Sequence, residues 1–210
     1  MNFGYFDEEN REYVITKPNT PAPWCNYLGS PEYGAIISNN AGGYSFVKSG
    51  ANGRILRYHF NSDDTPGRYI YLRDDENGDY WSASWQPVGK DLNEYKSEVH
   101  HGTAYTKMFA EYAGIKSEAM YYVPLNKVWC VKVTNNSDKP RKISVFGYAE
   151  LSNDDNYNQD QVNLQYTLCT TNTSFRKNKI YQQINLNWYK GPDGSNGKER
   201  FFGLAGQPVT

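Results

Sequence analysis

Two alternating runs flank one turn between Arg68 and Trp85: RYIYLR (68–73) and DYWSASW (79–85), joined by DDENG (74–78). Alternation of apolar and polar residues over this length is typical of a strand with one buried face. Asn77 and Gly78 tolerate the positive φ angles that a tight β-turn requires. The stretch therefore predicts a β-hairpin, and it indicates the fold class of the rest of the chain.

The same pattern continues on both sides of this hairpin. Short alternating runs recur between turn residues, and no stretch keeps a period of 3.6 over three turns. A second hairpin is predicted from 128–134 and 142–148 across the turn residues 135–140. The further expected strands are 12–16, 35–38, 44–48, 54–60, 99–109 with a break at Gly102, 115–123 after a break at Gly114, 162–170, 179–189 and 199–204. We therefore predict an all-β chain built as a large antiparallel sandwich.

Composition limits the classes of partner. The chain has 210 residues, of which 38% are hydrophobic, so it can bury a substantial core. Its formal net charge is -1, which provides no field to attract nucleic acid or an anionic membrane. The sequence begins without a basic flank or an apolar signal-peptide stretch. We expect a cytoplasmic protein without nucleic-acid or membrane partners.

The metal-binding residue types are sparse. The three cysteines are widely spaced and include no C-x-x-C pair, so they are predicted to be buried free thiols; they are Cys25, Cys130 and Cys169. His100 and His101 are adjacent, which places them on opposite faces of a strand, and the third histidine is His59. No metal is expected. A role of His100 or His101 as general base stays open beside a purely structural one.

Paired carboxylates could cleave sugars if two of them faced each other across a glycosidic bond. The candidates are neighbours in turns, where aspartate is favoured by its hydrogen bonds to the local backbone. They are Asp63 with Asp64, Asp74 with Asp75, and Asp154 with Asp155. A structural role is therefore favoured over catalysis.

One polar segment differs from the rest of the chain. Residues 152–161 are nearly all polar, which predicts a long surface loop. Residues 156–165 crowd Asn and Gln side chains beside Tyr157 and Tyr166. Amides donate to and accept from sugar hydroxyls, while aromatic faces stack on pyranose C–H groups. The segment indicates contact with carbohydrate, and a solvated loop remains the alternative.

A series of short motifs runs along the chain in one order: FGYFD (3–7), EYVIT (12–16), PWCNYLG (23–29), AGGYSF (41–46), PGRYIYLRDD (66–75), GDYWSASWQPV (78–88) and HGTAY (101–105). With these motifs the chain resembles the inverting disaccharide phosphorylases of the cellobiose and chitobiose phosphorylase family. The resemblance covers essentially the whole chain in order.

The resemblance implies an N-terminal β-super-sandwich domain, similar to galactose mutarotase and incomplete at its C-terminal end. In the family a helical linker, an (α/α)6 catalytic barrel and a small C-terminal β-domain follow. The catalytic acid and the phosphate-binding groups belong to the barrel, so no catalytic residue is expected within 1–210. The implied reaction is reversible phosphorolysis of a β-linked disaccharide or oligosaccharide. Inorganic phosphate is the co-substrate, no cofactor is needed, and the product is an α-sugar 1-phosphate.

The family's sandwich domain also helps to form a homodimer and sends a loop to the acceptor side of the active site. The matching residues here are Asn163, Gln165 and Tyr166. Asn163 and Gln165 fit the pattern of cellobiose phosphorylases, whereas Tyr166 replaces an arginine. A phenol has one donor and a guanidinium has five, so the acceptor site should differ and cellobiose is in doubt as the substrate.

Two other functions remain open at this stage. One is a stand-alone carbohydrate-binding or scaffold module with the same sandwich shape. The other is an independently active mutarotase-like or hydrolytic sandwich, which would need converging histidines or carboxylates.

Overall fold

A computed structural model describes residues 2–57, 67–124, 128–153, 156, 158, 160, 171–184 and 198–204. The strands in these residues form four sheets in which every pairing is antiparallel. The fold is therefore β-structured and antiparallel, as the alternating pattern predicts. Among the described residues, no helix has the length and apolar character to cross a membrane.

The largest sheet has six strands, and the other three sheets have three each. In spatial order, the six are β1 (Gly4–Asp7), β2 (Glu12–Ile15), β8 (Lys96–His101), β9 (Tyr105–Tyr112), β10 (Ile115–Tyr122) and β11 (Val128–Asn135). The second sheet consists of β12 (Ile143–Ala149), β6 (Arg68–Asp74) and β7 (Tyr80–Ser82). The third consists of β3 (Cys25–Gly29), β4 (Tyr33–Ser38) and β5 (Ser45–Val47), and the fourth of β13 (Thr171–Arg176), β14 (Lys179–Ile184) and β15 (Lys198–Gly203).

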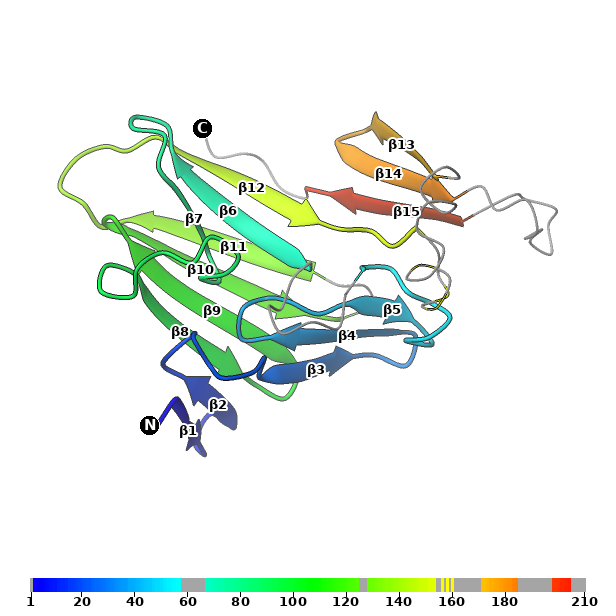
Figure 1. Ribbon diagram of the computed structural model, residues 1–210, viewed down its shortest axis with the longest axis horizontal. Coiled ribbons are helices and arrows are strands. Elements are labelled where there is room, and N and C mark those ends of the chain that lie inside the picture. Colours follow the sequence, from blue (N-terminus) through cyan, green and yellow to red (C-terminus); the bar gives the residue numbers. More distant parts are fainter. Residues whose placement is uncertain are drawn as a thin grey trace.

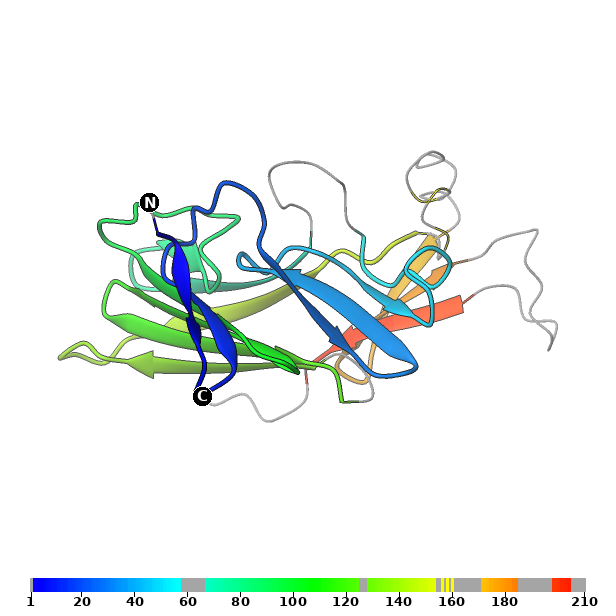
Figure 2. The same ribbon diagram turned by 90° about the horizontal axis from the view of Figure 1, so that it is seen from below.

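One hydrophobic core joins three of the four sheets. Met108 and Tyr121 reach it from the six-stranded sheet, Leu72 from β6, and Leu28 and Ile37 from the β3–β4–β5 sheet. All five side chains are at most 3% exposed. The β13–β14–β15 sheet lies at the opposite end of the molecule from β1 and β2 (Figures 1 and 2).

The hairpin predicted from 68–85 is present. Strands β6 and β7 pair with Leu72 opposite Trp81, and both side chains are buried. The connecting turn differs from a two-residue turn, because the Gly78 N–H donates to the carbonyl of Asp74 at 2.8 Å. Gly78 adopts a φ of 77°, whereas Asn77 does not have a positive φ. The glycine alone therefore supplies the left-handed conformation.

The second predicted hairpin is wrong in its pairing, although both of its strands exist. Strand β11 pairs with β10, and β12 pairs with β6 in another sheet. The turn residues 135–140 therefore connect two sheets. Local turn chemistry identified a reversal of the chain, but the partner of each strand was decided by edges formed elsewhere in the sequence.

Some predicted strands also changed extent. Residues 54–57 form isolated bridges instead of a strand, with Arg54 opposite Phe46 and Leu56 opposite Leu151. Strands β1, β3 and β13 were not predicted, and the expected strand 162–170 lies outside the described residues. Cys25 and Cys130 form no disulfide but are exposed, which corrects the expectation of burial. Cys169 and His59 also lie outside the described residues.

Candidate functional site

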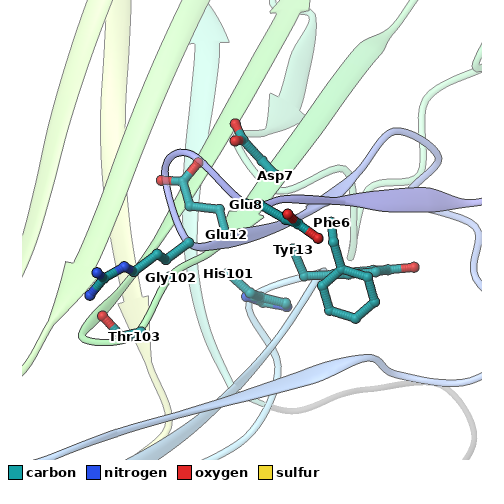
Figure 3. Close-up of a pocket in the computed structure, with 9 residues that line it drawn as sticks. Phe6, Asp7, Glu8, Glu12, Tyr13, His101, Gly102 and Thr103 are labelled. Atoms are coloured by element: carbon teal, nitrogen blue, oxygen red, sulfur yellow. The ribbon is translucent and has the colours of Figure 1, made fainter.

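A cavity of about 410 Å³ opens where the β1–β2 turn meets the β8–β9 turn. Figure 3 shows the side chains of Glu12, Tyr13 and His101 gathered around it. The rings of Phe6 and Tyr13 meet edge to face, with centroids 4.8 Å apart. Of the two histidines offered by the sequence as candidate bases, His101 lines this cavity, and His100 contacts the lining residue Glu12.

Glu12 is the buried carboxylate of this corner, with 6% of its surface exposed. The Tyr105 hydroxyl donates to Oε1 at 2.5 Å, the His100 Nδ1 lies 2.5 Å from Oε2, and the Lys107 Nζ lies 3.6 Å from Oε1. Burial by itself raises the pKa of Glu12, but the hydrogen bonds from Tyr105 and His100 outweigh it and lower the pKa. The carboxylate is therefore held ionised as the centre of a hydrogen-bonded cluster.

Carboxylates contact both ring nitrogens of His100, one from β2 and one from its own strand β8. Its Nε2 lies 2.7 Å from Glu98 Oε1, opposite the contact with Glu12. Burial lowers the pKa of His100, yet hydrogen bonds to Glu12 and Glu98 raise it above the ordinary value. The protonated ring donates from both nitrogens, so neither is available as a general base.

His101 points to the other face of β8 and, unlike His100, is neutral. Its Nε2 lies 3.0 Å from the Trp24 carbonyl, which can only accept, so Nε2 carries the hydrogen. Nδ1 then accepts from the Thr106 hydroxyl at 2.9 Å. Burial lowers the pKa of His101 to about 4. The neutral ring has both nitrogens occupied, which assigns it a structural role.

The described carboxylate candidates are also held by neighbours. Arg141 Nη2 lies 2.5 Å from Asp74 Oδ2. Asp75 accepts from the Ser144 hydroxyl at 2.7 Å and from Arg73. Asp63, Asp64, Asp154 and Asp155 lie outside the described residues. Across the described part of the chain, no three His, Cys, Asp or Glu side chains gather as metal ligands.

A second cluster of polar side chains surrounds Asp160, within the predicted sugar-contact segment 156–165. The Arg57 Nε donates to Asp160 Oδ2 at 2.9 Å, and Nη2 donates to both Oδ1 and the Asp160 carbonyl at 3.1 Å. Oδ1 also accepts from the Asn153 N–H at 2.8 Å. The side chains of Arg57 and Asp160 are only 8% and 2% exposed. The guanidinium therefore ties Asp160, in the middle of this segment, to the bridge-forming residues 54–57.

Further hydrogen bonds extend this network toward the β13–β14–β15 sheet. Arg200 donates to the carbonyls of Ser152 and Arg54, each at 2.8 Å. Gln182 donates to Asn153 Oδ1 at 3.1 Å. The expected surface loop is thus wrong for Ser152, Asn153 and Asp160, which are at most 6% exposed. Polar residues are buried here because arginine and amide side chains from distant strands satisfy them.

The predicted acceptor-site residues Asn163, Gln165 and Tyr166 lie outside the described residues, as do Tyr157, Gln159 and Gln161. The structure brings their neighbour Asp160 onto Arg57, a residue that the sequence did not single out. No local signal could have found this pair, because its members are 103 positions apart.

Comparisons with known proteins agree with an antiparallel β domain of this kind. The model of the glycosyl hydrolase 94 supersandwich domain matches residues 11–210. The chain is 46% identical over 89% of its length to an N,N'-diacetylchitobiose phosphorylase from Vibrio furnissii. It is 41% identical over 97% of its length to an N,N'-diacetylchitobiose phosphorylase from Vibrio proteolyticus, and 30% identical over 71% to a solabiose phosphorylase from Paenibacillus borealis.

The chain therefore belongs to the glycosyl hydrolase 94 family and contains its supersandwich domain. It spans 24% and 27% of the length of the two chitobiose phosphorylases, and 20% of the solabiose phosphorylase.

Proposed function

We propose that this chain is the N-terminal domain of an inverting β-glycoside phosphorylase, and that the domain shapes the acceptor side of the active site. The observation that carries the proposal is the 41–46% identity to two chitobiose phosphorylases over 89–97% of this chain. The substrate that these names favour is N,N'-diacetylchitobiose. A stand-alone binding module is not favoured, because the named relatives are phosphorylases.

The proposed reaction needs one acid from the protein, because phosphate is the nucleophile. A phosphate oxygen attacks the anomeric carbon from the face opposite the glycosidic bond. The bond to the leaving oxygen breaks as the acid protonates it. The products are α-N-acetylglucosamine 1-phosphate and N-acetylglucosamine. We assign the acid to a barrel domain beyond this chain, as the family resemblance implies. The described candidate carboxylates, Asp74 and Asp75, are held in structural contacts.

This domain's proposed part is to place Asn163, Gln165 and Tyr166 against the acceptor sugar, within a homodimer. Support comes from the buried contacts of Asp160, three positions before Asn163, with Arg57 and Asn153. Because these contacts fix Asp160, they restrict the conformations available to the residues that follow it.

The test is phosphorolysis by the full-length protein. We expect it to release N-acetylglucosamine 1-phosphate from N,N'-diacetylchitobiose and inorganic phosphate, and to act poorly on cellobiose. In reverse, it should release phosphate when N-acetylglucosamine 1-phosphate and N-acetylglucosamine are supplied together. Absence of phosphate-dependent cleavage of every β-linked disaccharide tested would contradict the proposal.

A further inference from the structure

The β3–β4–β5 sheet has one face in the core and one face in solvent. Pairing places Tyr27 opposite Ile36, and Gly34 opposite both Gly29 and Phe46, so these five residues share a face. They are half-buried or exposed, whereas the alternating residues Leu28, Ala35 and Ile37 are buried in the core. The outer face is thus aromatic and apolar and carries two glycines.

A cavity of about 500 Å³ lies on this outer face. Its volume is within the range of about 300–1,000 Å³ that is typical of small-molecule sites. Tyr27 stands on one side with 74% of its surface exposed. On the other side, the rings of Tyr44 and Phe46 lie with centroids 6.0 Å apart.

Contacts with Arg54 and with strand β4 hold the aromatic side of the cavity, Tyr44 and Phe46, in position. The guanidinium carbon of Arg54 lies 3.6 Å from the centroid of Tyr44, and its Nε donates to the Gly50 carbonyl at 2.9 Å. A Cβ at Gly34 would lie 2.4 Å from the Phe46 ring, so the ring can rest on β4 only because that position has no side chain. These rings are therefore preorganised, while Tyr27 adds a face that makes little contact with the core.

Of the described residues that line the cavity, only Lys48 is charged, and the nearby Glu32 offsets its charge. Lys48 lines the cavity, and its Nζ lies 3.5 Å from Glu32 Oε2, with both side chains more than 70% exposed. A neutral rim with exposed donors and acceptors suits hydroxyl groups better than a charged ligand. Pyranoses with equatorial hydroxyls present apolar C–H faces that stack on aromatic rings, and their edges form hydrogen bonds.

We propose that this groove is a second, non-catalytic binding site for a neutral β-linked oligosaccharide, held by stacking on Tyr27 and Phe46. The site is built only from described residues of β3, β4, β5 and their connections, and it takes no part in bond cleavage. It goes beyond the proposed reaction, because its ligand would be bound without phosphate.

The test is isothermal titration of the full-length protein in phosphate-free buffer with cellotetraose, and separately with tetra-N-acetylchitotetraose. We expect at least one of them to occupy two sites per chain, one catalytic and one in the groove. Tyr27→Ala should weaken binding at one site by about tenfold or more. Tyr27→Phe should retain both sites, because it keeps the ring.

A second variant tests the groove without removing an aromatic ring. A Cβ at Gly29 would lie 3.6 Å from the nearest atom, and Gly29 has no positive φ, so Gly29→Val fits the strand while filling the cavity. It should also remove one site. The matched control is Phe175→Ala on β13, because Phe175 is 73% exposed and Tyr27 is 74% exposed. That control should leave both sites intact.

Phosphorolysis kinetics separate this proposal from the proposed function. Because the groove is proposed to take no part in bond cleavage, both groove variants should keep the kcat and KM of the wild-type protein for its disaccharide. If the protein proves not to be a phosphorylase, a single site that Tyr27→Ala removes still supports the groove. Identical isotherms for the wild-type protein, Tyr27→Ala and Gly29→Val would overturn the groove proposal. The same result is expected if a second copy of the chain covers this face, and it would overturn the proposal in that case too.

Discussion

The guanidinium of Arg57 contacts both carboxylate oxygens of Asp160, with Nε 2.9 Å from Oδ2 and Nη2 3.1 Å from Oδ1. The two residues are 103 positions apart in the sequence. Asp160 lies three positions before Asn163, the first predicted acceptor residue. Both side chains are almost fully buried, so loss of Arg57 leaves the Asp160 carboxylate without a cation in the interior. Loss of the Asp160 charge leaves Arg57 with only the longer contact to Glu150, at 3.4 Å.

Asp160→Asn should therefore destabilise the protein by about 3 kcal/mol, with Arg57→Ala costing a similar amount. The free energy of unfolding, measured by urea denaturation, tests this. The matched control is Glu199→Gln, which breaks the exposed ion pair with Arg176. It should change the free energy by less than about 0.5 kcal/mol. Equal effects of the buried and exposed substitutions would contradict the assignment.

The Glu12–His100 contact predicts a stability window in pH. Hydrogen bonds lower the pKa of Glu12 from 4.5, so its contribution is present above that pH and is lost as pH falls through the folded pKa. The pKa of His100 is raised from 6.5, so its contribution is complete below that pH and is lost as pH rises through the folded pKa. The stability difference between the wild-type protein and Glu12→Gln should thus be largest between pH 4.5 and 6.5. Unfolding measured at a series of pH values should give this maximum, and a flat difference would refute the charged contact.

On acidification, His101 should act in the direction opposite to His100. Its pKa falls from 6.5 to about 4 on burial, so the unfolded chain binds a proton that the folded chain rejects between these values. The wild-type protein should lose roughly 3 kcal/mol as pH decreases across this interval. His101→Gln keeps a donor and an acceptor but does not titrate, so the loss measured for this variant should be correspondingly smaller. If His101→Gln and the wild-type protein lost the same stability over this pH interval, His101 would be protonated in the folded protein.

Tyr166→Ala in the full-length protein should raise the KM for the acceptor sugar in the synthetic direction and leave the KM for the sugar 1-phosphate unchanged. The reason is that only the acceptor is proposed to contact this segment. Tyr5→Ala is a suitable control, because Tyr5 is a tyrosine on β1 that is about half exposed. Acceptor kinetics that match the wild-type protein would remove Tyr166 from the site.

The chain 1–210 by itself should show no turnover of any β-linked disaccharide with phosphate. The physical reason is that its described histidines and the candidate carboxylates Asp74 and Asp75 are occupied by structural contacts. A coupled assay for sugar 1-phosphate tests this against the full-length protein. Measurable phosphorolysis by the chain alone would place the catalytic acid within it.

Local pattern was sufficient where neighbours in sequence are also neighbours in space. Alternation over 68–85 predicted the pairing of β6 with β7, because a short turn leaves the two runs little choice of partner. The same reasoning failed for β11 and β12, which pair with β10 and β6. It also misplaced Cys25 and Cys130 in the core, since composition does not indicate which face of a strand is covered.

The order of residues by itself determined the β class, the main hairpin and the family resemblance, because these depend on periodicity, turn residues and short motifs. Tertiary structure alone decided that Asp160 is buried on Arg57, that His100 and His101 differ in charge, and that Tyr27 and Phe46 flank one groove. Each of these facts depends on contacts between distant strands. Burial and pairing set the charge and accessibility of a side chain, and neither is a property of the residue type.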